Sequence, residues 1–121
     1  MLIDSNIIIY SHEEEYKYLR KLLMRKDCNI SEISRVEVLG YHLLTENQKD
    51  YFSVIFKYSS IIIPSKPIFD KAIEIRQKHN LKLGDSIIAA TAVVNNLTLH
   101  TRNLNDFKRV KKLKCFNPIG K

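Results

Sequence analysis

Residues 84–107, GDSIIAATAVVNNLTLHTRNLNDF, predict a helix, a short buried strand and a second helix, in that order. Small and branched apolar residues fill 85–95, which favours a helix packed closely against a sheet. The apolar segment Leu97–His100 predicts a strand, and a short helix is expected at 104–108. Helices that alternate with strands are typical of a parallel sheet covered on both faces.

The same alternation extends to both ends of the chain. Further strands are expected at Leu2–Ile3, Cys28–Ile30, Ser60–Ile63 and Lys114–Phe116, and further helices at 5–10, 13–26, 34–44, 48–58 and 67–79. The chain has 121 residues with only three Gly and three Pro, and shows neither a repeat nor a linker. We therefore expect a single α/β domain over residues 1–121, built on a mostly parallel sheet of about five short strands.

The charge is strongly basic. Twenty Lys and Arg stand against 13 Asp and Glu, which gives a formal net charge of +7 and favours a polyanionic partner. No acid follows Asp106, whereas several cations do. The residues predicted to contact nucleic-acid phosphates are Arg102, Lys108, Arg109, Lys111 and Lys112. The alternative for this tail is an ordinary solvated surface.

The cysteines and the N-terminal residues indicate the compartment in which the protein is expected. Cys28 and Cys115 each lie in a short apolar stretch, which suits buried thiols in a reducing environment, although sequence leaves a disulfide open. There is no CxxC, which argues against a thiolate zinc site. Asp4 interrupts the first apolar segment, so an export signal is not expected. The longest apolar run near the middle, Ile61–Ile63, is too short to span a membrane. We expect a cytoplasmic protein without membrane contact.

Four acids occur where strands or their connecting loops should give way to helices. They are Asp4, Glu37, Asp85 and Asp106. Ligands of open parallel sheets bind outside the carboxyl ends of the strands. If the four acids share that edge, they repel one another unless a cation joins them. Hard divalent ions such as Mg²⁺ prefer oxygen ligands, so the pattern predicts a metal-dependent enzyme acting on nucleic acid.

Each acid also has a structural explanation. Ser34 and Glu37 have the spacing of a capping box, and Asn103 and Asp106 repeat that spacing. Asp4 and Asp85 could each cap the helix that follows. Helix N-termini favour ionised carboxylates, so capping and metal binding require the same location. Sequence alone leaves both interpretations open.

Four segments resemble, in order, the signature segments of PIN-domain proteins. They are LIDSNIIIY at 2–10, SEISRVE at 31–37, GDSIIAATA at 84–92 and HTRNLNDF at 100–107. Together with the short length, they resemble a VapC-type toxin of a bacterial or archaeal toxin–antitoxin pair. The resemblance implies a three-layer α/β/α fold and an Mg²⁺- or Mn²⁺-dependent endoribonuclease. It also implies a homodimer and a cognate antitoxin whose tail enters the active-site groove.

The resemblance assigns a role to each matched residue. The family's acids correspond to Asp4, Glu37, Asp85 and Asp106, and its polar helpers to Asn6, Ser34, Thr101 and Asn103. Asp4, Glu37 and Asp85 are expected to hold the ion, directly or through water. Asp106 is expected to complete the ring or to orient the attacking water, a role that Asn103 could share. Polar neighbours would fix the carboxylate rotamers, and attack by water would leave a 5′-phosphate and a 3′-hydroxyl.

Three other functions fit the sequence less well. Metal-free cleavage by a histidine pair could draw on His12, His42, His79 and His100, most of which sit among polar residues. A phospho-accepting receiver domain would need an acid at the end of a middle strand, where Pro64 stands instead. An inactive PIN scaffold that only binds RNA or protein remains possible, although every matched acid is present.

Overall fold

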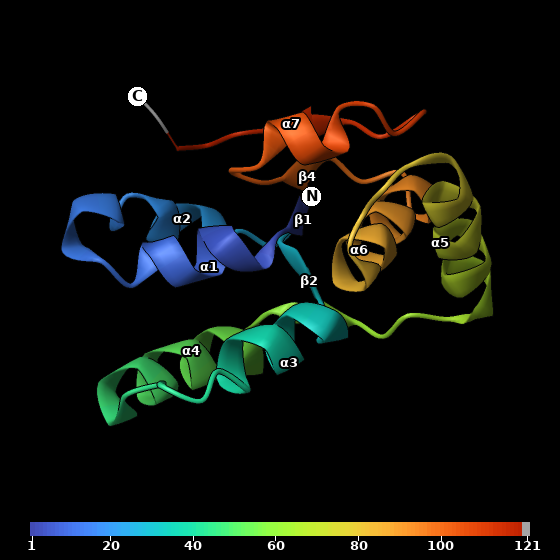
Figure 1. Ribbon diagram of the computed structural model, residues 1–121. Coiled ribbons are helices and arrows are strands. Elements are labelled where there is room, and N and C mark those ends of the chain that lie inside the picture. The colour runs from blue at the N-terminus through green and yellow to red at the C-terminus, as the bar shows by residue number, and fades with distance from the viewer. Residues whose placement is uncertain (120–121) are drawn as a thin grey trace.

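The computed structural model describes residues 1–119 as a five-stranded sheet with helices on both faces (Figure 1). The strand order is β3-β2-β1-β4-β5, and every neighbouring pair is parallel. The strands are β1 Leu2–Ile3, β2 Asn29–Ser31, β3 Ser60–Ile62, β4 Leu99–His100 and β5 Cys115–Phe116. The predicted parallel sheet of five short strands is confirmed.

The helices connect the strands and cover both faces of the sheet. They are α1 Ser5–Ser11, α2 Leu19–Leu23, α3 Glu32–Leu39, α4 Glu46–Tyr58, α5 Lys66–Lys78, α6 Leu83–Val94 and α7 Leu104–Phe107, with a 3₁₀ turn, η1, at Glu14–Tyr16. The single helix expected at 13–26 is wrong, because the chain forms η1 and then α2. The Tyr16 ring packs edge-on against Tyr10 with centroids 4.9 Å apart, which anchors the turn before α2 begins.

The helix expected at 34–44 begins and ends earlier. Ser31 is the N-cap of α3, since its side chain accepts a hydrogen bond from the Ile33 amide at 3.1 Å. The helix ends at Gly40, where a side chain would collide with the carbonyl oxygen of Val36. This shift matters for the site, because it moves Glu37 from the first turn of the helix into its second.

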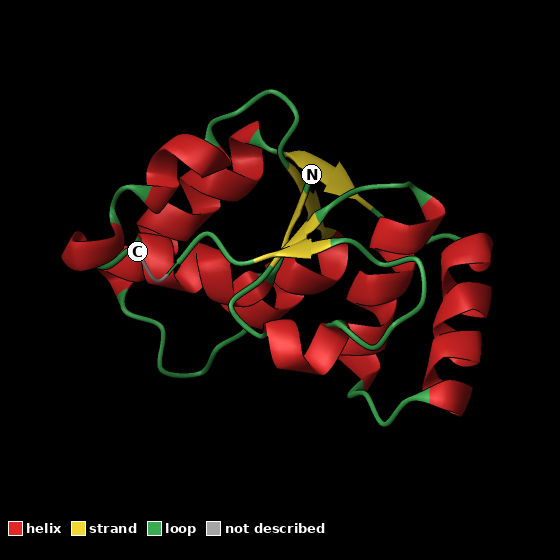
Figure 2. Ribbon diagram, turned by 90° about the horizontal axis from the view of Figure 1, so that it is seen from above, coloured by secondary structure: helices red, strands yellow, loops and turns green. Residues whose placement is uncertain are grey.

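Two apolar clusters fill the spaces on either side of the sheet. Successive strand residues point to opposite faces, so Leu2 packs with residues of α5, α6 and α7, whereas Ile3 packs with residues of α1, α2, α3 and α4. Figure 2 shows the strands at the centre with helices on both sides. The fold is therefore the expected three-layer α/β/α arrangement.

Helix α6 is buried on most of its surface. Ile87, Ile88, Ala89 and Ala90 are all in the core, and small side chains allow α6 to lie between the sheet and α5 (Figure 1). This packing fixes the start of α6, and with it Asp85, relative to the sheet. No helix within residues 1–119 is long and apolar enough to cross a membrane.

The sheet order sets the place where a ligand is expected. The chain runs outward from β1 through β2 to β3, and then crosses back to β4 on the other side of β1. The carboxyl ends of all five parallel strands lie at one edge, and ligands bind where the strand order reverses. Asp4 follows β1 and Thr101 follows β4, so these two residues flank that point.

Candidate active site

Asp4 is the buried centre of the site, with 5% of its surface exposed. It is the N-cap of α1, and its Oδ1 accepts a hydrogen bond from the Ser5 amide at 2.8 Å. Its Oδ2 accepts one from the Thr101 hydroxyl at 2.8 Å. The predicted capping role of Asp4 is confirmed, and Thr101 joins the end of β4 to the end of β1 through this carboxylate.

The pKa values show that other negative charges act on Asp4. Burial raises the pKa of Asp4 from 3.8 to about 6, although hydrogen bonds from Thr101 and Ser5 oppose the rise. The negative charges of Asp85 and Glu37 raise it further. Burial also raises the pKa of Asp85, and the charges of Glu37 and Asp106 add to that effect while Lys82 opposes it. The four acids are thus close enough to couple electrostatically.

Glu37 reaches the site from the middle of α3. Its Oε1 accepts a hydrogen bond from the Ser5 hydroxyl at 2.6 Å. The capping box expected between Ser34 and Glu37 is wrong, because α3 begins before Ser34 and is capped by Ser31. Glu37 is therefore free of any role in starting its own helix, and its exposed carboxylate lies beside the first residue of α1.

Asp85 and Asp106 lie in the first turns of α6 and α7. The predicted cap by Asp85 is wrong, because α6 begins at Leu83, after Lys82. Asn103 occupies the N-cap position of α7 but makes no side-chain capping bond, and only the Asp106 amide bonds back to the Asn103 carbonyl at 3.1 Å. Three of the four carboxylates are thus not used as caps, which favours a ligand-binding role for them.

Polar neighbours tie the two sides of the site together. The Asn6 side-chain amide donates toward Asp4 at 3.4 Å and toward Thr101 at 3.5 Å, and its Oδ1 accepts from the Arg102 amide at 3.2 Å. The Thr101 hydroxyl oxygen accepts from the Asn103 amide at 3.0 Å while it donates to Asp4. Asn6 and Thr101 therefore restrain the Asp4 carboxylate as well as the loop between β4 and α7.

Ser34, a predicted helper, makes no defined polar contact through its side chain. The side chain is fully buried in α3, and its Oγ has no hydrogen-bond partner within residues 1–119. A buried hydroxyl without a partner loses the hydrogen bonds that it made with water in the unfolded chain. The hydroxyl lies one helical turn before Glu37, so a bound ion or water near that residue would be close by.

The residues present fit a hard divalent cation. Carboxylate and amide oxygens are the ligands that Mg²⁺ and Mn²⁺ prefer. Burial, and to a lesser extent the charges of Asp85 and Glu37, raise the pKa of Asp4, and a bound cation would favour its ionised form. The side chains of residues 1–119 do not by themselves gather three Asp, Glu, His or Cys into a ready ligand set. The acids would therefore need small side-chain movements to share one ion.

Two residues of the site were not anticipated from the sequence. Ser5 bonds to two different acids, to Asp4 through its amide and to Glu37 through its hydroxyl. Gly84 allows α6 to approach Glu37, because a Cβ there would lie 3.1 Å from Glu37 Oε2. Ser5 follows Asp4 and Gly84 precedes Asp85 in the sequence, and this position could have indicated that both belong to the site. Their contact with Glu37, however, depends on the packing of α3.

The predicted nucleic-acid contacts separate into two groups. Arg102 lies at the acids, since its amide bonds to Asn6, and Lys108 and Arg109 follow directly after α7. Lys111 and Lys112 instead line a cavity of about 210 Å³ that also borders Val93, near the end of α6. Val93 is about 12 Å along α6 from Asp85, at a rise of about 1.5 Å per residue. That pair therefore lies away from the carboxylates.

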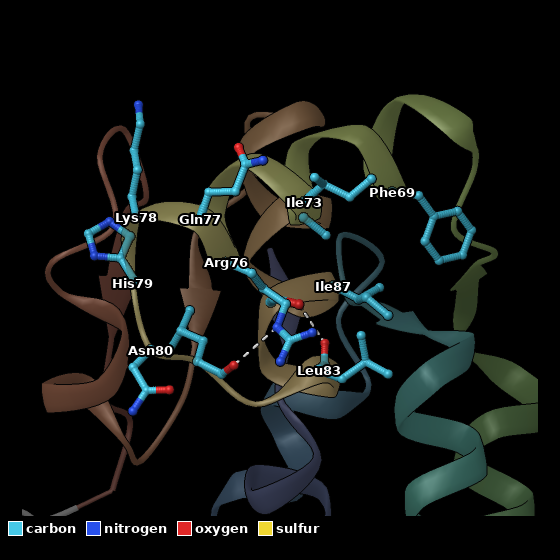
Figure 3. A pocket seen from close by; sticks show the side chains of 12 residues that line it. Phe69, Ile73, Arg76, Gln77, Lys78, His79, Asn80, Leu83 and Ile87 are labelled. Atoms are coloured by element: carbon cyan, nitrogen blue, oxygen red, sulfur yellow. Dashed lines mark hydrogen bonds between the residues drawn. The ribbon is translucent and has the colours of Figure 1, made fainter.

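The lining of the cavities separates the region of the acids from an apolar cavity elsewhere on the protein. A polar cavity of about 450 Å³ lies between the loop that follows β4 and Asn117, and both Arg102 and Asp106 line it. A larger, mostly apolar hollow of about 830 Å³ lies between α5 and the start of α6, where Figure 3 shows Phe69, Ile73 and Leu83 around it. Asp106 therefore lines a polar cavity, and none of the four acids lines the apolar hollow.

The histidines do not form an alternative centre. His12 bonds through Nε2 to Asn47 at 2.8 Å. His100 packs against Phe116 with ring centroids 5.4 Å apart, and burial lowers its pKa. These contacts give both rings structural roles, so the histidine-pair mechanism gains no support.

Comparison with known proteins identifies the fold family. The PIN domain family model matches residues 1–113. The chain belongs to the PIN domain family. No curated protein sequence matches it, so the similarity to individual proteins rests on solved structures.

This PIN domain is similar in structure to chains of several solved protein complexes. One is a toxin–antitoxin complex from Klebsiella pneumoniae, with 30% identity, 99% of this chain and 98% of that chain covered, and a TM-score of 0.78. Another is VapBC2 from Rickettsia felis bound to a DNA fragment from its promoter, with 24% identity, 96% coverage of each chain and a TM-score of 0.80. A third is FitAcB from Neisseria gonorrhoeae, with 25% identity, coverage of 97% and 96%, and a TM-score of 0.75. The resemblance to VapC-type toxins is confirmed at the level of fold and family.

Proposed function

We propose that this PIN domain is a metal-dependent endoribonuclease and the toxin of a type II toxin–antitoxin pair. The observation that carries the proposal is the coupling of four acids from separate elements at the carboxyl edge of the sheet. The charges of Asp85 and Glu37 raise the pKa of Asp4, and those of Glu37 and Asp106 raise the pKa of Asp85. Perturbed carboxylates that cluster in this way mark functional sites more often than structural ones.

Each residue has a part in the proposed hydrolysis. Asp4, Glu37 and Asp85 would hold Mg²⁺ or Mn²⁺, and Asp106, exposed at the edge, would complete the set or orient the attacking water. When bound, a divalent cation lowers the pKa of water and neutralises charge on the phosphate. Thr101 and the Ser5 amide keep both oxygens of Asp4 in place, so the buried carboxylate needs no reorganisation when the ion arrives.

The substrate would reach the acids across the basic surface. Arg102 borders the same polar cavity as Asp106, and Lys108 and Arg109 continue from α7. As cations beside an acidic metal site, Lys108 and Arg109 would bind the phosphates that flank the cleaved bond. Lys111 and Lys112 would contact a more distant part of a long RNA. The excess of basic residues in the whole chain supports a polyanionic substrate.

The similar structures support a partner protein. The Klebsiella pneumoniae structure is described as a toxin–antitoxin complex, which supports a cognate antitoxin for this chain. We also propose a homodimer, a cytoplasmic location and a single domain over residues 1–121. The exposed apolar side chains Phe69, Ile73 and Leu83 on α5 and α6 offer surface for association with another chain.

The experiment that tests the function compares matched carboxylate variants. Asp4→Asn and Asp85→Asn should abolish cleavage of RNA in Mg²⁺ or Mn²⁺, whereas Asp50→Asn, an exposed acid on α4, should leave it unchanged. Excess EDTA should stop the parent, and the products should carry 5′-phosphates. If Asp4→Asn cleaves as fast as Asp50→Asn, the assignment of the site is wrong.

The alternative function is an inactive scaffold that binds RNA or protein. It predicts RNA binding without cleavage at any metal concentration, and no growth arrest on expression. Growth arrest that Asp4→Asn relieves would exclude it.

A further inference from the structure

Arg102 and Tyr10 form a stacked pair beside the acids. The centre of the Arg102 guanidinium lies 5.2 Å from the centroid of the Tyr10 ring, within the range of a cation–π contact. Tyr10 is in turn supported edge-on by Tyr16 at 4.9 Å. Both tyrosines are half-buried, while Arg102 is exposed. One face of the guanidinium is thus backed by an aromatic ring.

The pair is held at a fixed position relative to the site. The Arg102 amide bonds to Asn6 Oδ1 at 3.2 Å, and the Asn6 amide group points at Asp4. Tyr10 follows Asp4 by six residues in the same segment, which is about 9 Å along α1 at a rise of about 1.5 Å per residue. A short single-stranded segment of RNA can bridge that distance.

The charges around the pair favour a base over a phosphate. No carboxylate within residues 1–119 forms an ion pair with Arg102, so its charge is not neutralised. However, the exposed acids of the neighbouring turn, Glu13, Glu14 and Glu15, lie next to Tyr16, and only Glu14 is paired, with Lys17 at 2.7 Å. These acids repel phosphates on the tyrosine side. An uncharged planar base meets no such repulsion.

We propose that the outer face of the Arg102 guanidinium, backed by Tyr10, stacks against an unpaired base of the RNA next to the cleaved phosphate. The inference rests on the proposed ribonuclease function and assigns to this pair the contact with an unpaired base. Unpaired bases stack on arginine planes and aromatic rings, whereas the bases of a duplex are not accessible in this way. A lysine cannot replace arginine in a planar stack.

The test measures stacking separately from affinity and from cleavage. Single-stranded RNA that contains 2-aminopurine at successive positions is bound in excess EDTA, which prevents metal-dependent cleavage. Fluorescence quenching at saturation reports stacking, and anisotropy of an end-labelled strand reports the dissociation constant. The variants are Arg102→Lys, which keeps the charge, Tyr10→Leu, which removes the support, and Tyr10→Phe, which keeps the ring. Arg25→Lys, at an exposed arginine after the end of α2 that pairs with Asp27, is the matched control.

The parent should quench 2-aminopurine strongly at one position and hardly at all in a duplex. Arg102→Lys and Tyr10→Leu should lose most of that quenching and bind about five- to fifty-fold more weakly, while Tyr10→Phe and Arg25→Lys should resemble the parent. Arg102 is exposed, so Arg102→Lys tests the idea even if Tyr10→Leu fails to fold.

Equal quenching by the parent and Arg102→Lys would overturn the inference, and so would equal losses in Arg102→Lys and Arg25→Lys. If the parent still cleaves RNA in Mg²⁺ in either case, the proposed function stands without the base platform. If the parent neither binds nor cleaves RNA, both proposals fail.

Discussion

Replacing Asp4 with Asn should stabilise the metal-free protein above about pH 6 while it abolishes cleavage. Asp4 is buried, and its pKa is raised from 3.8 to about 6. The pKa of Asp4 is higher in the folded protein than in the unfolded chain. Between pH 3.8 and about 6 the folded protein therefore keeps a proton on Asp4 that the unfolded chain has lost. The contribution of Asp4 to stability is therefore favourable at low pH and is lost as the pH rises through about 6. Asn cannot ionise, so the Asp4→Asn variant does not lose this stability at high pH.

The magnitude follows from the pKa shift. A rise of about 2 units corresponds to about 3 kcal/mol of unfavourable ionisation well above pH 6. The variant does not recover all of it, since an amide nitrogen in place of Oδ2 would face the Asn6 amide and require the Thr101 hydroxyl to turn and accept. Weakened hydrogen bonds of this kind cost about 1 kcal/mol. We expect a net gain of about 2 kcal/mol at pH 8 and no gain at pH 4.

Urea unfolding of the parent, Asp4→Asn and Asp50→Asn at pH 4 and pH 8 in EDTA measures the effect. The difference in unfolding free energy between Asp4→Asn and the parent should grow with pH, and that for Asp50→Asn should stay near zero. Saturating Mg²⁺ should then stabilise the parent by about 2.7 kcal/mol at a hundredfold excess over the dissociation constant, and not the variant. A difference that does not change with pH would refute the argument from burial.

Other predictions concern single contacts. Thr101→Val removes the hydroxyl that donates to Asp4, so the pKa of Asp4 should rise further and the acid limb of the pH–rate profile should move to higher pH; an unmoved limb would remove Thr101 from the site. Replacing Lys108 and Arg109 together with Gln should weaken RNA binding and flatten the slope of log K against log salt by about 1.4, as expected for two single-strand phosphate contacts; an unchanged slope would assign both to a solvated surface. Burial raises the pKa of the Cys28 thiol to about 11, so Cys28 should react with a disulfide reagent only after unfolding, and fast labelling of that residue in native protein would contradict its burial.

The helix boundaries show where sequence reasoning reached its limit. Ser34 and Glu37 have the spacing of a capping box, yet Ser31 caps α3. Both serines are competent caps, and the choice depended on β2 extending to Ser31, opposite Ile62 of β3. Pairing between strands is a long-range property that local spacing does not encode. The single helix expected at 13–26 failed for a similar reason, because the contact of Tyr16 with Tyr10 fixes a turn there.

The sequence by itself determined the alternation of strands and helices, the position of Asp4, Asp85 and Asp106 at or near the start of a helix, and the resemblance to PIN domains. Periodicity, small residues in α6 and short motifs are local signals, so they can be recognised in the amino-acid sequence alone. Only the tertiary structure decided that Glu37 meets Ser5 across α3 and α1, that Lys111 and Lys112 lie away from the acids, and that Arg102 lies over Tyr10. Those contacts join segments that are far apart in the chain, and they form only when the two apolar clusters pack against opposite faces of the sheet.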